Sequence, residues 1–518
     1  MYQRRQQVAK RLRFYSAVAG AGFLAYLGYY LTKVCKTPTL VYRSGALSHI
    51  VRENCSSLIR AYYPPLWAFN THLQTALGVL RGAAINAGWV RQLVPTSDGG
   101  QFALDWWQGE TSSNVPPETP IVLVLHGVTG GSFEGTCKAM CKEAASRGYR
   151  PAVMVYRGCG GVELLNDQIY SANFTDDAHL AVETINRQYP NAKLTAVGFS
   201  LGSIILTKYL GEADSGHWEP EGDGIAAAVA ISSPFCLESA GRFLARPWTI
   251  AWLYNLIIAY RLKMYGKWHH HVFKDCERLE HVSEKQRQFW TIGQFDERIM
   301  SKMMGFQSAQ EYYQAASSLP QIPKIRTPIL FLAAEDDVFL GELPIRQCSS
   351  NPYTLLAITS RGGHVAFLTG LWPFGQAWMD QVALDFLQAV LSHPERIAQI
   401  GTEVSSVRPH LSSVQGRSPR KSGRRSVDQA LNMAAAALDR HSSMGNMGMA
   451  TDPGSLEDLV GRAASLMSGT GRASPEPLKK ISSRADAGRD LMGTMGRAAS
   501  FQTALDSLKR SDSMSHGS

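Results

Sequence analysis

Cysteine is scarce in this sequence, with eight residues among 518. Cys137 and Cys141 stand four residues apart on a predicted helix, and no second pair lies at the spacing of a metal site. We therefore interpret the cysteines as free thiols in the core, and we expect neither a disulfide framework nor a bound metal. No nucleotide or other cofactor is expected either.

Basic residues outnumber acidic ones, 52 to 43, but they form no continuous basic stripe. They gather at the N-terminus and are scattered through the C-terminal region, and aromatic side chains do not alternate with them. A nucleic-acid-binding surface is therefore not expected. We interpret the two basic regions as a membrane-proximal head and a tail.

Charge is absent from one long run, residues 14–32 (FYSAVAGAGFLAYLGYYLT). At about 1.5 Å per helical residue, this run nearly spans a bilayer core of roughly 30 Å, and its tyrosines would lie at one interface. A cleaved signal peptide is the alternative, but the run is long for one and no convincing cleavage site precedes Lys33. We predict a basic head and a transmembrane anchor over residues 1–36.

Three further regions follow the predicted anchor. Residues 37–90 are predicted to be a linker with a helical extension, and residues 91–395 alternate apolar, strand-like runs with helical patterns. Residues 396–518 are rich in Ser, Gly, Arg and Met and poor in aromatics, so this tail is predicted to be disordered. The predicted parallel strands of the middle region begin near residues 121, 151, 194, 225, 327 and 354.

Continuous apolar strands separated by helices indicate an α/β fold with a mostly parallel sheet and helices on both faces. An antiparallel hairpin that turns at residues 98–100 is predicted to precede these strands. Ligands of such sheets bind at the carboxyl ends of the strands. Ser200, Asp337 and His364 follow three of the predicted strands in the chain order nucleophile, acid and base of the α/β-hydrolase fold, which we therefore predict.

Ser200 lies in the stretch GFSLG, which is typical of a sharp turn from a strand to a helix. Side chains two residues before and after the serine would collide in such a turn, and both positions, Gly198 and Gly202, are glycine. A serine hydroxyl needs a base within hydrogen-bond reach. We predict Ser200 as the nucleophile and His364, in the loop after the final strand, as its base.

Two further parts of a hydrolase site are predicted from position. Asp337 is the preferred acid to orient the histidine, with Asp336 as the immediate alternative and Glu335 as a more remote one. The backbone N–H groups of Val128, in the loop HGVTGGS, and of Leu201, after the nucleophile, are predicted to form the oxyanion hole.

A helical lid is predicted over about residues 236–320, between the serine strand and the acid strand. Its uncharged segment 247–260 is too short to span a bilayer, so it is either a packed helix or a helix that faces lipid. His269–His271 could suggest a metal site. Adjacent histidines on a regular element cannot all aim at one ion, which favours a basic surface turn.

The chain resembles the membrane-anchored α/β-hydrolase-domain family of lipid esterases, which includes phospholipases and monoacylglycerol lipases. The resemblance runs from DGGQFALDWW to GGHVAFL and includes YRGCGG, GFSLG with KYLGE, QFDERIMSKMMGFQSAQEYYQAASS and IPKIRTPILFL. It implies Ser200, Asp337 and His364 as nucleophile, acid and base. Val338 stands where the family usually has a proline after the acid.

Two sets of candidate modification sites bear on membrane orientation. Basic residues before the apolar run outnumber those after it, which predicts a cytosolic N-terminus and a catalytic domain in the lumen of the endoplasmic reticulum or another endomembrane. Asn54 and Asn173 would then be usable glycosylation acceptors. The tail also carries serines that resemble sites of basic-directed kinases, although low-complexity filler is an equal alternative; they are Ser426, Ser465, Ser474 and Ser500.

Together these features predict a serine hydrolase that cleaves carboxylic esters of membrane lipids through an acyl-enzyme. Its partners would be the lipid substrate and a membrane, reached through the N-terminal helix and the lid. Two alternatives remain at this point: a catalytically inactive hydrolase fold that serves as a binding module, and a soluble short-chain carboxylesterase whose apolar head is a signal.

Overall fold

The structure is a computed structural model that describes residues 2–109, 115–218, 224–283, 285–372 and 375–403. The four candidate kinase sites of the tail, Ser426, Ser465, Ser474 and Ser500, lie outside the described residues. Regular structure reaches eight residues into the predicted tail, because the helix α16 (Pro394–Glu403) includes residues 396–403 and buries Ile400.

The described part of the chain contains one nine-stranded sheet with the order β1-β9-β8-β7-β6-β4-β5-β3-β2. The inner strands β4 to β9 are parallel, whereas β1, β2 and β3 pair antiparallel at the two edges. The strands are β1 (Thr39–Tyr42), β2 (Gly88–Pro95), β3 (Gln101–Gln108), β4 (Ile121–Leu125), β5 (Arg150–Val155), β6 (Leu194–Phe199), β7 (Ile225–Ile231), β8 (Ile329–Ala334) and β9 (Thr354–Thr359).

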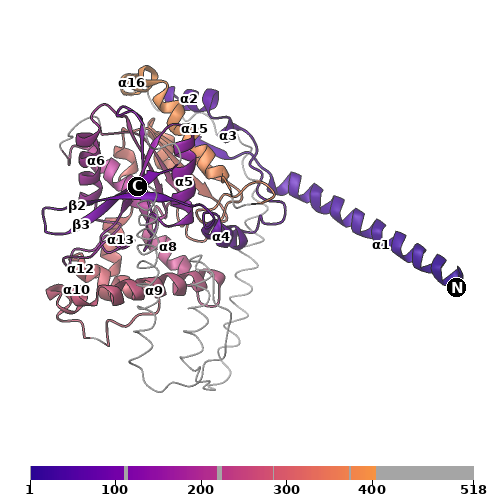
Figure 1. Cartoon of the computed structure of the whole chain (residues 1–518), viewed down its shortest axis with the longest axis horizontal. Coiled ribbons are helices and arrows are strands. Elements are labelled where there is room, and N and C mark those ends of the chain that lie inside the picture. Colours follow the sequence, from indigo (N-terminus) through magenta and orange to yellow (C-terminus); the bar gives the residue numbers. More distant parts are fainter. Residues whose placement is uncertain (1, 110–114, 219–223, 284, 373–374, 404–518) are drawn as a thin grey trace, which may run out of the picture. The chain divides into compact units, whose positions relative to one another are not determined.

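Helices cover both faces of this sheet, which confirms the predicted α/β-hydrolase fold (Figure 1). One face carries α6 (Asp176–Gln188) and α7 (Leu201–Ala213), and the other carries α5 (Gly135–Ser146) and α15 (Trp378–Leu391). The inner strands β4 to β9 are buried on both sides because helices cover both faces, and this explains their continuous apolar sequences. The predicted hairpin is β2–β3, with Gly99 at φ 79° in its turn.

The region predicted as a linker and helical extension is part of the fold. It supplies the edge strand β1, which pairs with β9, and the helices α2 (Ala46–Asn54), α3 (Ser56–Ile59) and α4 (Thr71–Leu80). Arg81, just after α4, forms a fully buried ion pair with Asp380 of α15. A buried pair of this kind is costly to break, so it holds the extension firmly against the sheet domain.

The predicted anchor lies in α1 (Tyr2–Tyr29) and the π-helical turn Tyr30–Val34 that continues it. Among the described residues, we find no helix whose length and apolar character together suffice to cross a membrane. The tyrosines expected at a membrane interface contact the following segment instead: Tyr26 and Tyr30 donate hydrogen bonds to the carbonyls of Leu66 and Pro64, and both rings contact Phe69.

The predicted lid is present between β7 and β8 as a group of helices (Figure 1). They are α8 (Leu237–Leu244), α9 (Ile250–Trp268), α10 (His270–Lys274), α11 (Ile292–Phe295), the π-helical turn Asp296–Met300, α12 (Ser301–Met303) and α13 (Ala309–Ala316); short 3₁₀ turns lie at Glu277–Leu279 and, between the lid and β8, at Ile322–Lys324. Residues 250–260 of the uncharged stretch 247–260 form the first part of α9, which buries Tyr254 and Ile257 and exposes Ile250 and Leu253.

The cysteines, the three adjacent histidines and the two candidate glycosylation asparagines lie outside the hydrolase site, and the structure shows the surroundings of each. All eight cysteines are free thiols, and six of them are buried. His269 is buried and bonds through Nε2 to the carbonyl of Gly158, whereas His270 and His271 are exposed. Within the described ranges, no cluster of three or more metal-ligating side chains occurs. Asn54 is exposed at the end of α2, and Asn173 is half-buried in the loop before α6.

Candidate active site

Ser200 occupies a strained turn between β6 and α7. Its backbone has φ 51° and ψ −114°, a conformation that residues other than glycine rarely adopt. Its N–H donates to the carbonyl of Ile231. A Cβ at Gly198 would lie 2.6 Å from the carbonyl oxygen of Gly202, and one at Gly202 would lie 2.3 Å from that of Leu125. Both flanking glycines are therefore required by backbone contact, and the turn presents the serine hydroxyl at the end of the strand.

We expect Gly202→Ala to lower the free energy of unfolding by about 1–3 kcal/mol, the usual cost of overpacking. Alanine is the better helix former, by roughly 1 kcal/mol, so the loss would arise from the contact with β4. Urea unfolding measures it. The matched control is Gly266→Ala in α9, where nothing lies within 4 Å of an added Cβ and a small gain in stability is expected. An equal gain in the free energy of unfolding in both variants would contradict the close approach of Gly202 to the backbone of Leu125.

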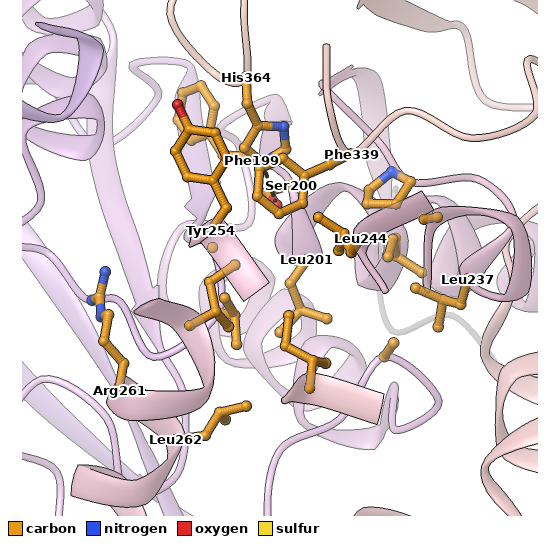
Figure 2. A pocket seen from close by; sticks show the side chains of 18 of the residues that line it. Phe199, Ser200, Leu201, Leu237, Leu244, Tyr254, Arg261, Leu262, Phe339 and His364 are labelled. Atoms are coloured by element: carbon orange, nitrogen blue, oxygen red, sulfur yellow. Dashed lines mark hydrogen bonds between the residues drawn. The ribbon is translucent and has the colours of Figure 1, made fainter. Parts of the chain in front are cut away.

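The structure brings Ser200, His364 and Asp337 together in one hydrogen-bonded chain, of which Figure 2 shows Ser200 and His364. Ser200 Oγ lies 2.9 Å from His364 Nε2, and His364 Nδ1 lies 3.0 and 2.9 Å from the two carboxylate oxygens of Asp337. An ionised carboxylate can only accept, so Nδ1 carries the proton and Nε2 is left to accept from the serine hydroxyl. This is the geometry that nucleophilic activation of a serine requires.

The neighbouring carboxylates have different surroundings, which separates the three candidate acids. Asp337 has a buried side chain, and it accepts from the N–H of Phe339 at 2.8 Å as well as from His364. Asp336 accepts instead from the N–H of Gly363, and burial raises its pKa to about 6. Glu335 is exposed. Of the three, only Asp337 touches the imidazole.

The helix α4, in the region predicted as a linker and helical extension, supports the acid and base loops. Thr75 accepts from the backbone N–H of His364 at 3.0 Å, and Thr71 donates to the carbonyl of Asp336 at 2.7 Å. Gln74 accepts from the N–H of Leu368 at 3.0 Å. No catalytic motif marks these residues in the sequence, because each acts through a single ordinary hydrogen bond to backbone that is distant along the chain.

The predicted oxyanion-hole residues line the same cavity as Ser200. Leu201 is the first residue of α7, so its N–H has no acceptor within the helix. Val128 lies in the loop after β4 and lines the same cavity. The preceding His126 is buried, which lowers its pKa to about 4. The neutral ring bonds through Nδ1 to the carbonyl of Gly127 at 2.7 Å and so fixes the start of this loop.

A lid residue that sequence reasoning missed contacts the same loop. Arg261 of α9 donates from Nη2 to the carbonyl of Thr129 at 2.9 Å and lies 3.5 Å from Glu134. Thr129 has φ 53°, and its N–H donates to the Tyr170 hydroxyl at 3.0 Å. The loop that carries Val128 is thus held in an unusual conformation by side chains from two other segments.

The hydroxyl of Ser200 opens into a cavity of about 290 Å³ between the sheet and the lid (Figure 2). Most of its lining is apolar and includes Leu237, Leu244, Ile257, Leu262 and Phe339. A chamber of this size and character suits an apolar chain, such as the acyl group of a lipid.

Three charged residues interrupt the apolar lining: Arg261, Glu134 and Asp296. Asp296 is buried and accepts from the hydroxyl of Tyr313 at 2.7 Å, and desolvation raises its pKa to about 7. Both Asp296 and Tyr313 belong to the long stretch QFDERIMSKMMGFQSAQEYYQAASS. This motif of the resemblance was the feature of the sequence that could have marked them as part of the site.

Comparison with known proteins finds similarity over most of the chain. Residues 116–350 match the family model described as serine aminopeptidase, S33. The phospholipase ABHD3 of Homo sapiens is 31% identical over 398 residues, which cover 75% of this chain and 94% of that protein. The monoacylglycerol lipase of Saccharomyces cerevisiae is 33% identical over 299 residues, which cover 57% of this chain and 63% of that protein.

Among solved structures, the Pyrococcus furiosus esterase Pf2001 is similar, with a TM-score of 0.33 and 15% identity, and 54% of this chain and 85% of that chain are covered.

Proposed function

This chain belongs to the α/β-hydrolase family of lipid esterases that includes phospholipase ABHD3, and we propose that it hydrolyses carboxylic esters of lipids with Ser200 as the nucleophile. The observation that supports this most strongly is the unbroken chain of hydrogen bonds from Ser200 through His364 to Asp337 at the mouth of an apolar cavity. An inactive binding module would not need all three groups at bonding distance.

The proposed reaction has two halves. Ser200 Oγ attacks the ester carbonyl carbon while His364 Nε2 takes the hydroxyl proton, and the N–H groups of Val128 and Leu201 stabilise the oxyanion that forms. The intermediate collapses to an acyl-serine, and the histidine returns its proton to the departing alcohol. A water molecule, deprotonated by the same nitrogen, then attacks the acyl group, releases the carboxylic acid and restores Ser200.

The substrate class is tested by release of fatty acid from a panel of lipid esters by the purified full chain. We expect monoacylglycerol or phosphatidylcholine with a long acyl chain to react faster than a short-chain ester such as p-nitrophenyl acetate, because the cavity lining is mostly apolar. Ser200→Ala is the control for contaminating lipases. A preference for the acetate ester would contradict the lipid assignment and favour a short-chain carboxylesterase.

We expect Arg261→Met to lower kcat about tenfold with little change in KM. The side chain positions the loop that carries Val128, and a hydrogen bond from a charged group contributes about 1.5–3 kcal/mol. The matched control is Arg242→Met in the lid helix α8, whose exposed guanidinium lies 3.7 Å from Glu238. Arg261→Lys should restore part of kcat if it reaches Thr129. A change confined to KM would instead assign Arg261 to substrate binding.

We further propose that residues 14–32 attach the protein to an endomembrane, with the N-terminus in the cytosol and Ser200 in the lumen. The uncharged run and the basic residues that precede it support this orientation. Protease treatment of sealed microsomes tests it, since a C-terminal tag should be digested only after detergent is added. Digestion without detergent would contradict the orientation and favour cytosolic kinases for the serines of the tail.

A further inference from the structure

The lid contains a second cavity, of about 730 Å³, that is distinct from the one at Ser200. It lies between α9, α10 and the segment 287–299. Its buried lining is apolar and includes Leu256, Leu262, Phe273, Phe289 and Phe295. Its more accessible lining includes the basic side chains of Lys263, Lys267, His270 and Lys274 as well as Gln288 and Trp290, and the half-buried Arg287 also lines it. None of the residues that line this cavity is acidic.

The basic side chains are arranged at some cost to the lid. Lys263 and Lys267 are four residues apart on α9, and like charges at this spacing destabilise a helix. Within the described part of the chain, neither Lys267 nor Lys274 forms an ion pair. Arg287 is already engaged, since it donates to the backbone carbonyls of Phe273, Leu279 and Val282. It therefore builds the wall, whereas Lys267 and Lys274 remain to meet an anion.

We propose that this cavity binds an anionic phospholipid, with the phosphate at Lys267 and Lys274 and an acyl chain along the apolar lining. Basic side chains above an apolar surface match the two ends of such a lipid. Trp290 lines the cavity and is 44% exposed, and Lys263 Nζ lies 3.7 Å from its ring centroid. Tryptophan is favoured at the interface between water and lipid.

The second cavity shares a wall with the first. Leu262 and Phe295 line both, so a lipid chain in the second cavity would touch the same side chains that face the acyl cavity at Ser200. Phe295 also precedes Asp296, the buried carboxyl of the first cavity. A lipid bound in the second cavity would therefore act on the catalytic pocket through one layer of side chains. The proposed lipid site itself does not depend on the proposed catalytic role of Ser200.

The test uses dihexanoyl phosphatidic acid, a soluble phosphate-bearing lipid, and the full chain carrying Ser200→Ala to prevent turnover. We expect Lys267→Glu/Lys274→Glu to weaken binding in calorimetric titration at least about tenfold, since each lysine near an anionic lipid contributes about 1 kcal/mol. The control Lys142→Glu/Lys324→Glu makes the same change in net charge at exposed positions outside the cavity and should bind as before. Unchanged binding in the first pair would overturn the proposal.

Two further arms locate the ligand and define its chemistry. A photoreactive analogue of the same phosphatidic acid should label peptides from residues 256–299, and labelling confined to other segments would refute the site. Inorganic phosphate should compete poorly, because it lacks the acyl chain. If it competes as well as the lipid, the cavity is an anion site and the lipid assignment is wrong. If the charge-reversed variant does not fold, the double variant Lys267→Gln/Lys274→Gln, which removes both charges without reversing them, is titrated in its place.

Discussion

Replacement of Ser200 by alanine is expected to abolish labelling by a fluorophosphonate and to lower kcat by about 10⁴- to 10⁶-fold, as in other intact triads. The alanine cannot form the acyl-enzyme, because it has no oxygen to attack the carbonyl carbon. The remaining activity would come from substrate binding and from the oxyanion hole. Gel-based labelling and fatty-acid release measure the two effects.

The control for this experiment is Ser146→Ala, which removes an exposed hydroxyl at the end of α5 whose one hydrogen bond to a described residue is to the carbonyl of Glu143. It should label as the unmodified protein does. Thermal unfolding of both variants separates loss of the nucleophile from loss of the fold. Full labelling of Ser200→Ala would eliminate the proposed mechanism.

Asp337→Asn is expected to lower kcat by about 10⁴-fold, the effect of the same change in a comparable triad. The amide can still accept from the N–H of Phe339, so the fold should survive. It can also donate to His364 Nδ1, which favours the tautomer whose Nε2 carries the proton and cannot accept from Ser200. Recovery of activity at high pH is not expected, since the tautomer is set by hydrogen bonding.

Asp336→Asn is the matched control, because it makes the identical change one residue away. Asp336 contacts the N–H of Gly363 and has no contact with the imidazole, so we expect a far smaller loss of kcat. A larger loss in Asp336→Asn than in Asp337→Asn would transfer the role of the acid by one residue and would leave the fold assignment intact.

Local sequence was sufficient to predict the parallel sheet and the elbow. Strands such as IVLVL and ILFLAA are apolar along their whole length because both faces of the sheet are covered, and their alternation with helical patterns indicates a parallel sheet. The stretch GFSLG also marks both glycines beside Ser200, although only Gly198 avoids nearby backbone, at Gly202 and Ser203, whereas Gly202 avoids Leu125 on the adjacent strand. The chain order of Ser200, Asp337 and His364 then identified the fold.

Tertiary structure alone decided the features that depend on residues far apart in the chain. The edge strand β1 has only four residues, and its pairing with β9 lies more than 300 positions away, so no local period reveals it. Asp337 and Asp336 are alike in sequence and differ only in which one faces His364. Arg261 reaches Thr129 across 132 positions, and the wall shared by the two lid cavities exists only once α9 and α11 have packed. Side chains that act through one long-range contact leave no periodic or motif signal, because such a contact constrains a single position on each partner.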